Sequence, residues 1–310
     1  MRKALLIANP NAGQFKLQRE RATKTLCEAL KKRGVAIEVQ YTTAPNDASR
    51  MASEAAQKGY TDVIVSGGDG TINEAVQGLA GTNLRLTVWP SGTANVLGKE
   101  LGMPRNPTQL AQLIATGKTF QMHLGCAEYE ATKERRYFFL MAGIGLDASI
   151  VNQVNPKLKR GVGKAAFVYS GLEHLANWQP IPFRVEVNGR RYRATFAAIG
   201  KAPHYGGNLS ITPNARLDQP EFEICLINSK NRLRYLQLLT QAIVNGVEGN
   251  QKDIRFFRTT KVRAVGDVLV QADGELIGNL PMSFSIAPHS IEVTVKEKGA
   301  SLLSLPFFAR

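Results

Sequence analysis

The first hundred residues alternate short apolar runs with helix-like patterns, and this alternation constrains the fold more than any other feature. Apolar runs that predict strands lie at residues 3–8, 35–41, 61–66 and 84–89. Segments with apolar side chains near helical spacing follow them, at residues 17–33, 47–58, 71–79 and 93–101. Repeated β-α-β units predict a parallel sheet covered by helices, with ligands at the carboxyl ends of the strands.

From about residue 120 the sequence pattern changes. Short β-rich runs dominate, at residues 137–141, 183–187, 195–199, 222–227, 261–265, 268–271, 282–286 and 291–295. Helical patterns interrupt them at residues 163–176 and 232–247. Many short strands separated by turn residues predict a mainly antiparallel β-sandwich. We therefore expect an α/β domain over residues 1–125 and a β-rich domain over residues 126–310, whose C-terminal tail could pack back on the first domain.

The chain is strongly basic, with 39 Lys and Arg against 25 Asp and Glu and a net charge of +14. A basic excess favours a polyanion, either nucleic acid or an anionic membrane surface. The sequence has no zinc-finger spacing and no aromatic-rich RNA-recognition signature, which favours the membrane. No segment reaches the roughly 20 apolar residues that span a bilayer, and three scattered cysteines suggest neither a metal site nor disulfides. We expect a cytoplasmic protein that contacts the inner membrane face peripherally.

The motif with the clearest chemistry is Ser-Gly-Gly-Asp-Gly-Thr-Ile-Asn-Glu, over residues 66–74. It follows an apolar strand and opens a helix, so backbone N–H groups and the positive end of the helix dipole would face a phosphate. A carboxylate there would be repelled unless a metal ion lay between, so Asp69 is a candidate Mg²⁺ contact. The alternative is a plain strand-to-helix turn, because the motif matches neither the dinucleotide fingerprint nor the Walker A loop.

This motif and the segment Pro-Ser-Gly-Thr-Ala-Asn, over residues 90–95, resemble the catalytic domain of the diacylglycerol kinase family. Soluble bacterial lipid kinases and sphingosine kinases belong to that group. Further elements continue the match in the expected order, at residues 9–13, 41–48, 142–147, 159–163 and 273–275. The resemblance covers nearly the whole chain. It implies an ATP- and Mg²⁺-dependent kinase that phosphorylates a hydroxyl of diacylglycerol or a related membrane lipid.

The resemblance also implies a nucleotide site built from four loops at strand ends. Its residues would be Asn9, Thr42, Gly67, Gly68, Asp69, Gly70, Thr71, Ile72, Asn73 and Thr93. Taken alone, Asn9 and Thr42 are more typical of residues that stabilise loops or cap helices. Their positions after consecutive parallel strands favour a shared site independently of the family.

A second catalytic element is Asp273-Gly274-Glu275. Asp-Gly is a hairpin signal, and from the residues alone a turn and a catalytic element are equally open. In the family the matching glutamate is the general base, so Glu275 would take the proton of the lipid hydroxyl as that oxygen attacks the γ-phosphoryl group. Asp273 is the second catalytic candidate, and it would shape the turn or assist with metal.

Two positions depart from the family pattern. His123 stands where an aspartate of the metal network is expected, either as a polar residue at a strand end or as a compensating ligand. Residues 213–220 resemble a loop in which two aspartates and a glycine bind a structural Mg²⁺. Here Asp218 remains as a candidate ligand, while Gln219 and Pro220 replace the other two. Losing one charged ligand weakens a hard-cation site, so we do not expect this metal to be bound.

Basic clusters recur in the second domain, at residues 157–160, 190–193 and 230–234, and an apolar tail occupies residues 302–310. Each cluster alone is typical of a solvated edge. Together with the tail they suggest docking on an anionic bilayer, although the tail could equally pack on the protein.

Two other functions remain open. NAD kinases share the Gly-Gly-Asp-Gly-Thr loop and phosphorylate a soluble nucleotide, but residues 90–95 and 273–275 favour a lipid kinase. A catalytically silent lipid-binding protein would explain His123 and Gln219. The intact carboxylates of the two catalytic elements argue against it.

Overall fold

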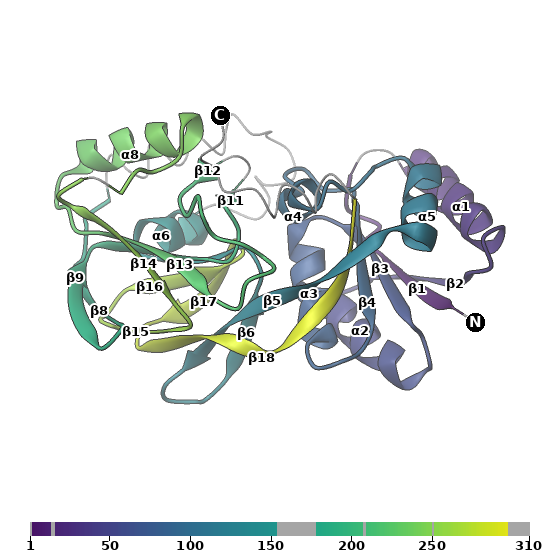
Figure 1. The fold of residues 1–310 in the computed structure, drawn as a ribbon, viewed down its shortest axis with the longest axis horizontal. Coiled ribbons are helices and arrows are strands. Elements are labelled where there is room, and N and C mark those ends of the chain that lie inside the picture. The colour runs from purple at the N-terminus through teal and green to yellow at the C-terminus, as the bar shows by residue number, and fades with distance from the viewer. Residues whose placement is uncertain (1, 14–15, 154–177, 207–208, 250, 297–310) are drawn as a thin grey trace. The chain divides into compact units, whose positions relative to one another are not determined.

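The computed structural model describes residues 2–13, 16–153, 178–206, 209–249 and 251–296 (Figure 1). The chain forms two compact units. Of the described residues, unit 1 contains those up to Leu124, the short segment Leu217–Gln219 and those from Ala287 to Lys296. Unit 2 contains Gly125–Arg216 and Pro220–Ile286.

Unit 1 has a parallel sheet with the strand order β2-β1-β3-β4-β18. Its strands are β1 (Lys3–Ala8), β2 (Ala36–Tyr41), β3 (Asp62–Gly67), β4 (Arg85–Pro90) and the end of β18 (Met282–Val295). All six residues of β3 are buried, as are five of six in β1 and in β4. Continuous burial is typical of parallel strands covered on both faces. The predicted parallel α/β domain is confirmed.

In the part of unit 1 that the structure describes, the helices are α1 (Lys16–Lys31), α2 (Asp47–Gln57), α3 (Asp69–Leu79), α4 (Val96–Glu100) and α5 (Pro107–Thr116). The pattern of apolar residues predicted the first four. It missed α5, which the local residues specify clearly. The Asn106 side chain accepts hydrogen bonds from the backbone N–H groups of Thr108 and Gln109, and Pro107 occupies the first helical position.

Unit 2 is a mainly antiparallel β-sandwich, as predicted. One sheet has the order β14-β13-β10-β7-β16-β17, and the other has β18-β15-β8-β9, with β5 paired to β18 and β6 paired to β5. The elements are β5 (Lys118–Tyr129), β6 (Arg135–Phe138), β7 (Met141–Ile144), α6 (Leu146–Gln153), β8 (Phe183–Val187), β9 (Arg190–Ala194), β10 (Phe196–Gly200), β11 (His204–Tyr205), β12 (Leu209–Ser210), β13 (Phe222–Ile227), α8 (Arg232–Val244), β14 (Ile254–Thr259), β15 (Lys261–Val265), β16 (Leu269–Ala272) and β17 (Glu275–Asn279). Apolar side chains from both sheets form one core, in which the rings of Phe138 and Phe222 stack with centroids 5.8 Å apart.

Two strand predictions in the second half of the chain were wrong in detail. The run at 137–141 does not form one strand, because the chain bends at Phe139 and Leu140 and continues as β7 in the other sheet. The runs at 282–286 and 291–295 form the single strand β18. The predicted helix at 163–176 lies outside the described residues.

We expected one boundary between the domains, near residue 125. Instead, each unit is made of more than one segment of the chain. Strand β18 pairs with β15 in unit 2 at its beginning and belongs to unit 1 from residue 287. There Val293 pairs with Leu86 of β4, and the hydroxyls of Thr294 and Thr87 lie 2.8 Å apart. One uninterrupted extended segment therefore completes both units.

Candidate active site

Loops at the carboxyl ends of β1, β3 and β4 lie in contact in unit 1. The side-chain amide of Asn9, after β1, donates a hydrogen bond to the hydroxyl of Thr71 in α3, over 2.9 Å. The backbone N–H of Asn9 donates to the carbonyl of Ser66, over 2.9 Å. After β4, the N–H of Ser91 donates to the carbonyl of Gly67, over 3.1 Å. Three of the four loops expected to hold a nucleotide are thus directly connected.

Glycines allow these loops to approach one another closely. A Cβ atom on Gly92 would lie 2.5 Å from the Cα atom of Gly68, so no side chain fits between the two backbones. At Gly13, where φ is +80°, a Cβ atom would lie 2.6 Å from the carbonyl oxygen of Ser91. Gly68 directly precedes α3 and provides no side-chain cap for it. Exposed backbone at a helix N-terminus is the usual site for a phosphate group.

Asp69 lies in the first turn of α3 and binds the next loop. One carboxylate oxygen accepts the backbone N–H of Val96 over 3.1 Å, and the other accepts that of Leu97 over 3.3 Å. Asp69 therefore caps the start of α4 and ties it to α3. Burial raises the pKa of Asp69, while the two N–H donors and Lys99 offset part of that rise. This capping function was not predicted from the sequence.

The Asp69 carboxylate also fits a divalent cation bound together with a nucleotide. Each of its oxygens accepts one of these two backbone N–H groups, and a carboxylate oxygen has a second lone pair for a hard cation. The described residues contain no group of three or more His, Cys, Asp or Glu side chains that could hold a metal. A cation at Asp69 would therefore take its other ligands from phosphate oxygens and water.

Thr42, the predicted contact after β2, is buried, and its backbone N–H donates to the carbonyl of Ala8 over 3.0 Å. The following loop is organised by Asp47. Its carboxylate accepts hydrogen bonds from both the N–H and the hydroxyl of Thr43, each over 2.8 Å, and from the N–H of Ala44 over 3.0 Å. These hydrogen bonds, with that from Arg50, hold the pKa of Asp47 far below its usual range.

The remaining residues that were predicted to contact the nucleotide differ in their exposure to solvent. Gly70 and Thr93 are exposed, so they can contact a ligand. Ile72 and Asn73 have no exposed surface, and the Asn73 side chain and carbonyl accept hydrogen bonds from Gln77. The structure places these two side chains in the interior of unit 1.

In unit 2, Asp273 and Gly274 form the two-residue turn between β16 and β17. Both have positive φ, 49° and 84°, which Asp-Gly turns favour, so the backbone forms the hairpin that the Asp-Gly pair indicates. The Asp273 carboxylate is buried and accepts the backbone N–H groups of Phe139, Leu140 and Met141, over 2.8, 2.9 and 3.0 Å. These bonds hold the bend that separates β6 from β7. Asp273 therefore stabilises the bend between β6 and β7 as well as its own turn.

Glu275 begins β17, and 39% of its side chain is exposed. Its Oε2 atom forms an ion pair with Arg136 of β6. Of the two predicted catalytic carboxylates, Glu275 is therefore the accessible one. Asp273 is buried among backbone donors.

A hydrogen-bond network that the sequence did not predict supports this turn. Gln271 is fully buried, and its Oε1 atom accepts the N–H of Gly274 over 2.7 Å and the hydroxyl of Tyr205 over 3.1 Å. Its side-chain amide donates to the carboxylate of Asp147 in α6. Burial raises the pKa of Asp147 to about 7, although the bond from Gln271 lowers it. A carboxyl group that titrates near neutral pH is thus linked to the turn that carries Glu275.

The loop at 213–220 does not fit a structural magnesium ion. Lys201 is fully buried, and its ammonium donates to the carbonyls of Arg216 over 3.0 Å and Glu221 over 3.1 Å, at the two ends of the Asp218 segment. The Glu223 carboxylate accepts both the backbone N–H and the side-chain amide of Asn214. A buried ammonium repels a divalent cation and already supplies a positive charge to the loop carbonyls. Protein groups hold this loop.

His123, in β5, donates its backbone N–H to the carbonyl of Leu217 over 2.9 Å. This bond connects β5 to the segment at 217–219 within unit 1. His123 therefore lies inside β5 and not at a strand end, where one interpretation of the sequence placed it, and this bond uses its backbone alone.

Comparison with known proteins agrees with the fold and its loops. The model of the diacylglycerol kinase catalytic domain matches residues 3–127, and that of the YegS C-terminal NAD kinase beta sandwich-like domain matches residues 141–295. A diacylglycerol kinase of Mycobacterium tuberculosis (strain ATCC 25618 / H37Rv) is 31% identical over 269 residues, which cover 85% of this chain and 86% of that protein. A diacylglycerol kinase of Bacillus subtilis (strain 168) is 29% identical over 313 residues, covering 97% and 99%. The crystal structure of a diacylglycerol kinase from Bacillus anthracis str. Sterne has a TM-score of 0.73 at 21% identity, covering 96% and 97%.

The glycine-rich strand-end loops on an α/β unit, joined to a β-sandwich, define a kinase that phosphorylates an alcohol group. This chain belongs to the diacylglycerol kinase catalytic-domain family.

Proposed function

We propose that this protein transfers the γ-phosphoryl group of ATP to a hydroxyl of diacylglycerol or a related membrane lipid, at the cytoplasmic face of the inner membrane. The observation that carries the proposal is the convergence of three strand-end loops in unit 1, through the Asn9–Thr71 hydrogen bond and the Gly68–Gly92 and Gly13–Ser91 contacts. The names of the relatives support the choice of diacylglycerol.

The proposal assigns the nucleotide phosphates to the backbone at the start of α3. Asp69 would hold Mg²⁺ there, and this ion neutralises charge on the β- and γ-phosphate oxygens during transfer. The capping bonds from Val96 and Leu97 fix the direction of the Asp69 carboxylate. Thr93 and Gly70 are exposed near the same loops and are the further candidates for nucleotide contacts.

Glu275 would act as the general base. The acceptor oxygen forms a bond to the γ-phosphorus, the bond to the β-phosphate oxygen breaks, and ADP leaves with that electron pair. The proton of the acceptor hydroxyl passes to the Glu275 carboxylate. The ion pair with Arg136 uses Oε2 and orients the group.

Replacing Glu275 by Gln tests this proposal, because the amide keeps the size of the side chain and removes its basicity. We expect single-turnover phosphorylation to fall about 10²- to 10⁴-fold, with MgATP affinity unchanged. Glu128→Gln is a matched control, since Glu128 also pairs with an arginine of β6, Arg135, over 2.7 Å. That variant should keep wild-type turnover.

Two results would contradict the assignment of Glu275. One is phosphoryl transfer by Glu275→Gln at the wild-type rate, and the other is a loss of activity caused by failure to bind ATP. A panel of acceptors with labelled ATP tests the substrate. Diacylglycerol should be phosphorylated faster than sphingosine or NAD, and a preference for NAD would overturn the lipid assignment.

A further inference from the structure

Helix α8 is apolar on two opposite faces. Tyr235, Leu238 and Ala242 are buried on the face that packs against the rest of unit 2. The opposite face carries exposed apolar side chains at positions spaced for one side of a helix, namely Leu233, Leu236, Ile243 and Val244. Leu233 is 68% exposed and Val244 is 70% exposed. Exposed apolar side chains that gather on one side of a helix indicate an interaction surface.

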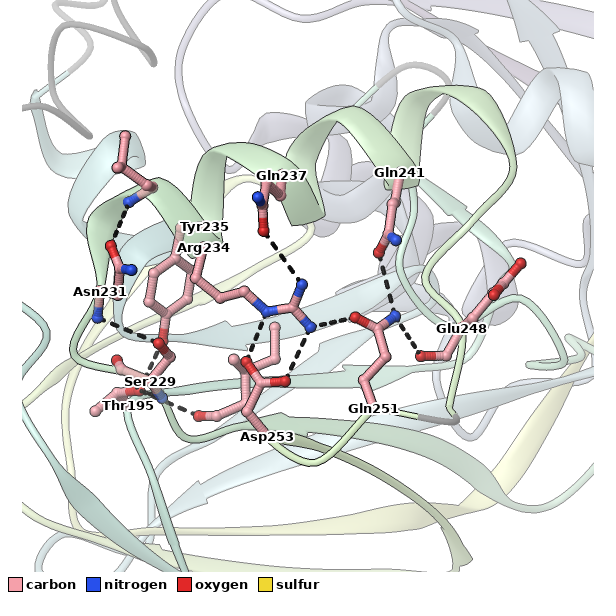
Figure 2. A network of polar contacts seen from close by, with 12 residues as sticks. Thr195, Ser229, Asn231, Arg234, Tyr235, Gln237, Gln241, Glu248, Gln251 and Asp253 are labelled. Carbon is pink, nitrogen blue, oxygen red and sulfur yellow. Dashed lines mark hydrogen bonds and ion pairs between the residues drawn. The ribbon is translucent and has the colours of Figure 1, made fainter.

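The inner face of α8 is firmly attached, so the outer face cannot turn inward. Figure 2 shows Arg234 of α8 reaching Asp253, with N–O distances of 2.7 and 2.9 Å, and also contacting Gln251. The hydroxyls of Tyr235 and Thr195 lie 2.6 Å apart. The ion pair raises the pKa of Arg234 and lowers that of Asp253, which is consistent with a tight contact.

The charge around this face is positive. Residues 230–247 include no Asp or Glu, while Lys230 and Arg232 are exposed at the N-terminal end of the helix. The charge of Arg234 is matched by Asp253, and the first acidic residue after the helix is Glu248. An apolar face bordered by basic residues is complementary to an anionic bilayer. A second copy of the chain that docked through the same helix would present the same positive charge and, within residues 230–247, no carboxylate to meet it.

We propose that the outer face of α8 docks on an anionic lipid bilayer, with Leu233, Leu236, Ile243 and Val244 in the boundary between headgroups and acyl chains. Interfacial helices bury their apolar face about 5–10 Å into this boundary. Lys230 and Arg232 then lie at the level of the lipid phosphates. The inference rests on the proposed function, because a diacylglycerol acceptor lies in such a bilayer.

The test compares the double variant Leu233→Gln, Val244→Gln with the control Leu17→Gln. Leu17 is 69% exposed on α1 of unit 1, so its replacement removes about as much exposed apolar surface as the replacement of Leu233 alone, at a different place. Binding to vesicles of phosphatidylcholine mixed with phosphatidylglycerol is measured by sedimentation. We expect the affinity of the double variant to fall about tenfold or more and that of the control to stay at the wild-type value. Wild-type binding should also weaken with salt, because the Debye length falls from about 10 Å at 0.1 M to about 3 Å at 1 M.

Unchanged vesicle binding by the double variant would overturn the proposal. A loss of solution dimers with intact vesicle binding would also overturn it, and would assign the face to a second copy of the chain. Phosphorylation of a short-chain diacylglycerol dispersed in water separates this inference from the proposed function. The double variant should phosphorylate that acceptor at the wild-type rate. If the wild-type protein cannot, the proposed function fails, while the vesicle measurement still decides the role of α8.

Discussion

Asp69, in the first turn of α3, and Asp273, in the turn between β16 and β17, both stand beside glycines, one in each unit. In both residues the two carboxylate oxygens accept backbone N–H groups. Asp69 binds the N–H groups of Val96 and Leu97 and remains partly exposed. Asp273 binds three N–H groups at the bend between β6 and β7, and 7% of it is exposed. The two motifs look alike in sequence, but the two carboxylates differ in their exposure to solvent and in the number of backbone N–H groups that they accept.

This difference separates a structural carboxylate from one that can also bind a ligand. Asp273 is enclosed by backbone donors, so its role is to hold the bend. Asp69 caps a five-residue helix and keeps access to solvent, so it can bind a cation as well. In the hairpin of unit 2 that contains Asp273, the accessible carboxylate is that of Glu275, two residues further on. The structural carboxylate is thus the one that is more deeply buried and accepts more backbone N–H groups.

The largest effect on stability should follow Asp273→Asn. Asn tolerates the positive φ of this position, so the change removes mainly the charge and one acceptor oxygen. Three buried N–H groups then lose charge-assisted bonds, and we expect the free energy of unfolding to fall by roughly 3–5 kcal/mol. Urea denaturation measures the loss. Glu275→Gln, in the same hairpin, should change it by less than about 1 kcal/mol. Equal losses in both variants would remove the distinction between them.

A smaller effect, with a pH dependence, should follow Asp147→Asn. Between its ordinary pKa and about 7, Asp147 is protonated in the folded chain and ionised in the unfolded one. The free energy of unfolding of the wild type therefore falls as pH rises through this window and is constant above it. The full linkage is about 4 kcal/mol. Because Asp147 is partly exposed, we expect the variant to be more stable by roughly half of that at pH 8. Denaturation at several pH values should show no difference at pH 3, and a parallel pH profile for both proteins would contradict this.

The smallest effect on stability should follow Asp69→Asn. Asn caps helices about as well as Asp, so the free energy of unfolding should change by less than about 1 kcal/mol. Nucleotide binding should respond differently, because an amide is a poorer ligand for Mg²⁺ than a carboxylate. Calorimetry should show weaker binding of ATP with Mg²⁺ present and little change without it. A stability loss as large as that of Asp273→Asn, with MgATP affinity unchanged, would make Asp69 purely structural.

The sequence predicted the regular parts of the fold well. Apolar runs and helical spacing predicted β1–β4 and α1–α4, since buried parallel strands and amphipathic helices follow local periodicity. Helix α5 was missed although Asn106-Pro107 is a strong start signal and the buried residues Leu110, Ala111 and Ile114 follow at helical spacing. The bend at Phe139–Leu140 could not be predicted, because its cause is Asp273, more than a hundred residues later.

For the candidate site, the sequence predicted which loops meet, but it did not predict the individual hydrogen bonds between them. The position of Asn9 after β1 and of Gly67–Thr71 after β3 predicted that they would meet, and they do. The capping of α4 by Asp69 and the bridge from Gln271 to Asp147 depend on distances between distant segments, which a single sequence does not contain. The Lys201 ammonium in the 213–220 region was missed for the same reason.

Strand β18 has a consequence for the order in which the protein can fold during synthesis. Thr87 and Thr294, whose hydroxyls meet beside β4, are 207 positions apart in the chain. On the ribosome, β1–β4 emerge long before the strand that covers the open edge of β4. Unit 1 therefore keeps an unpaired parallel edge until β18 has been made, and exposed strand edges promote association with other chains. Domains commonly fold in the order of their synthesis. Here unit 1 emerges first, but its sheet is complete only after the residues of unit 2 have been synthesised.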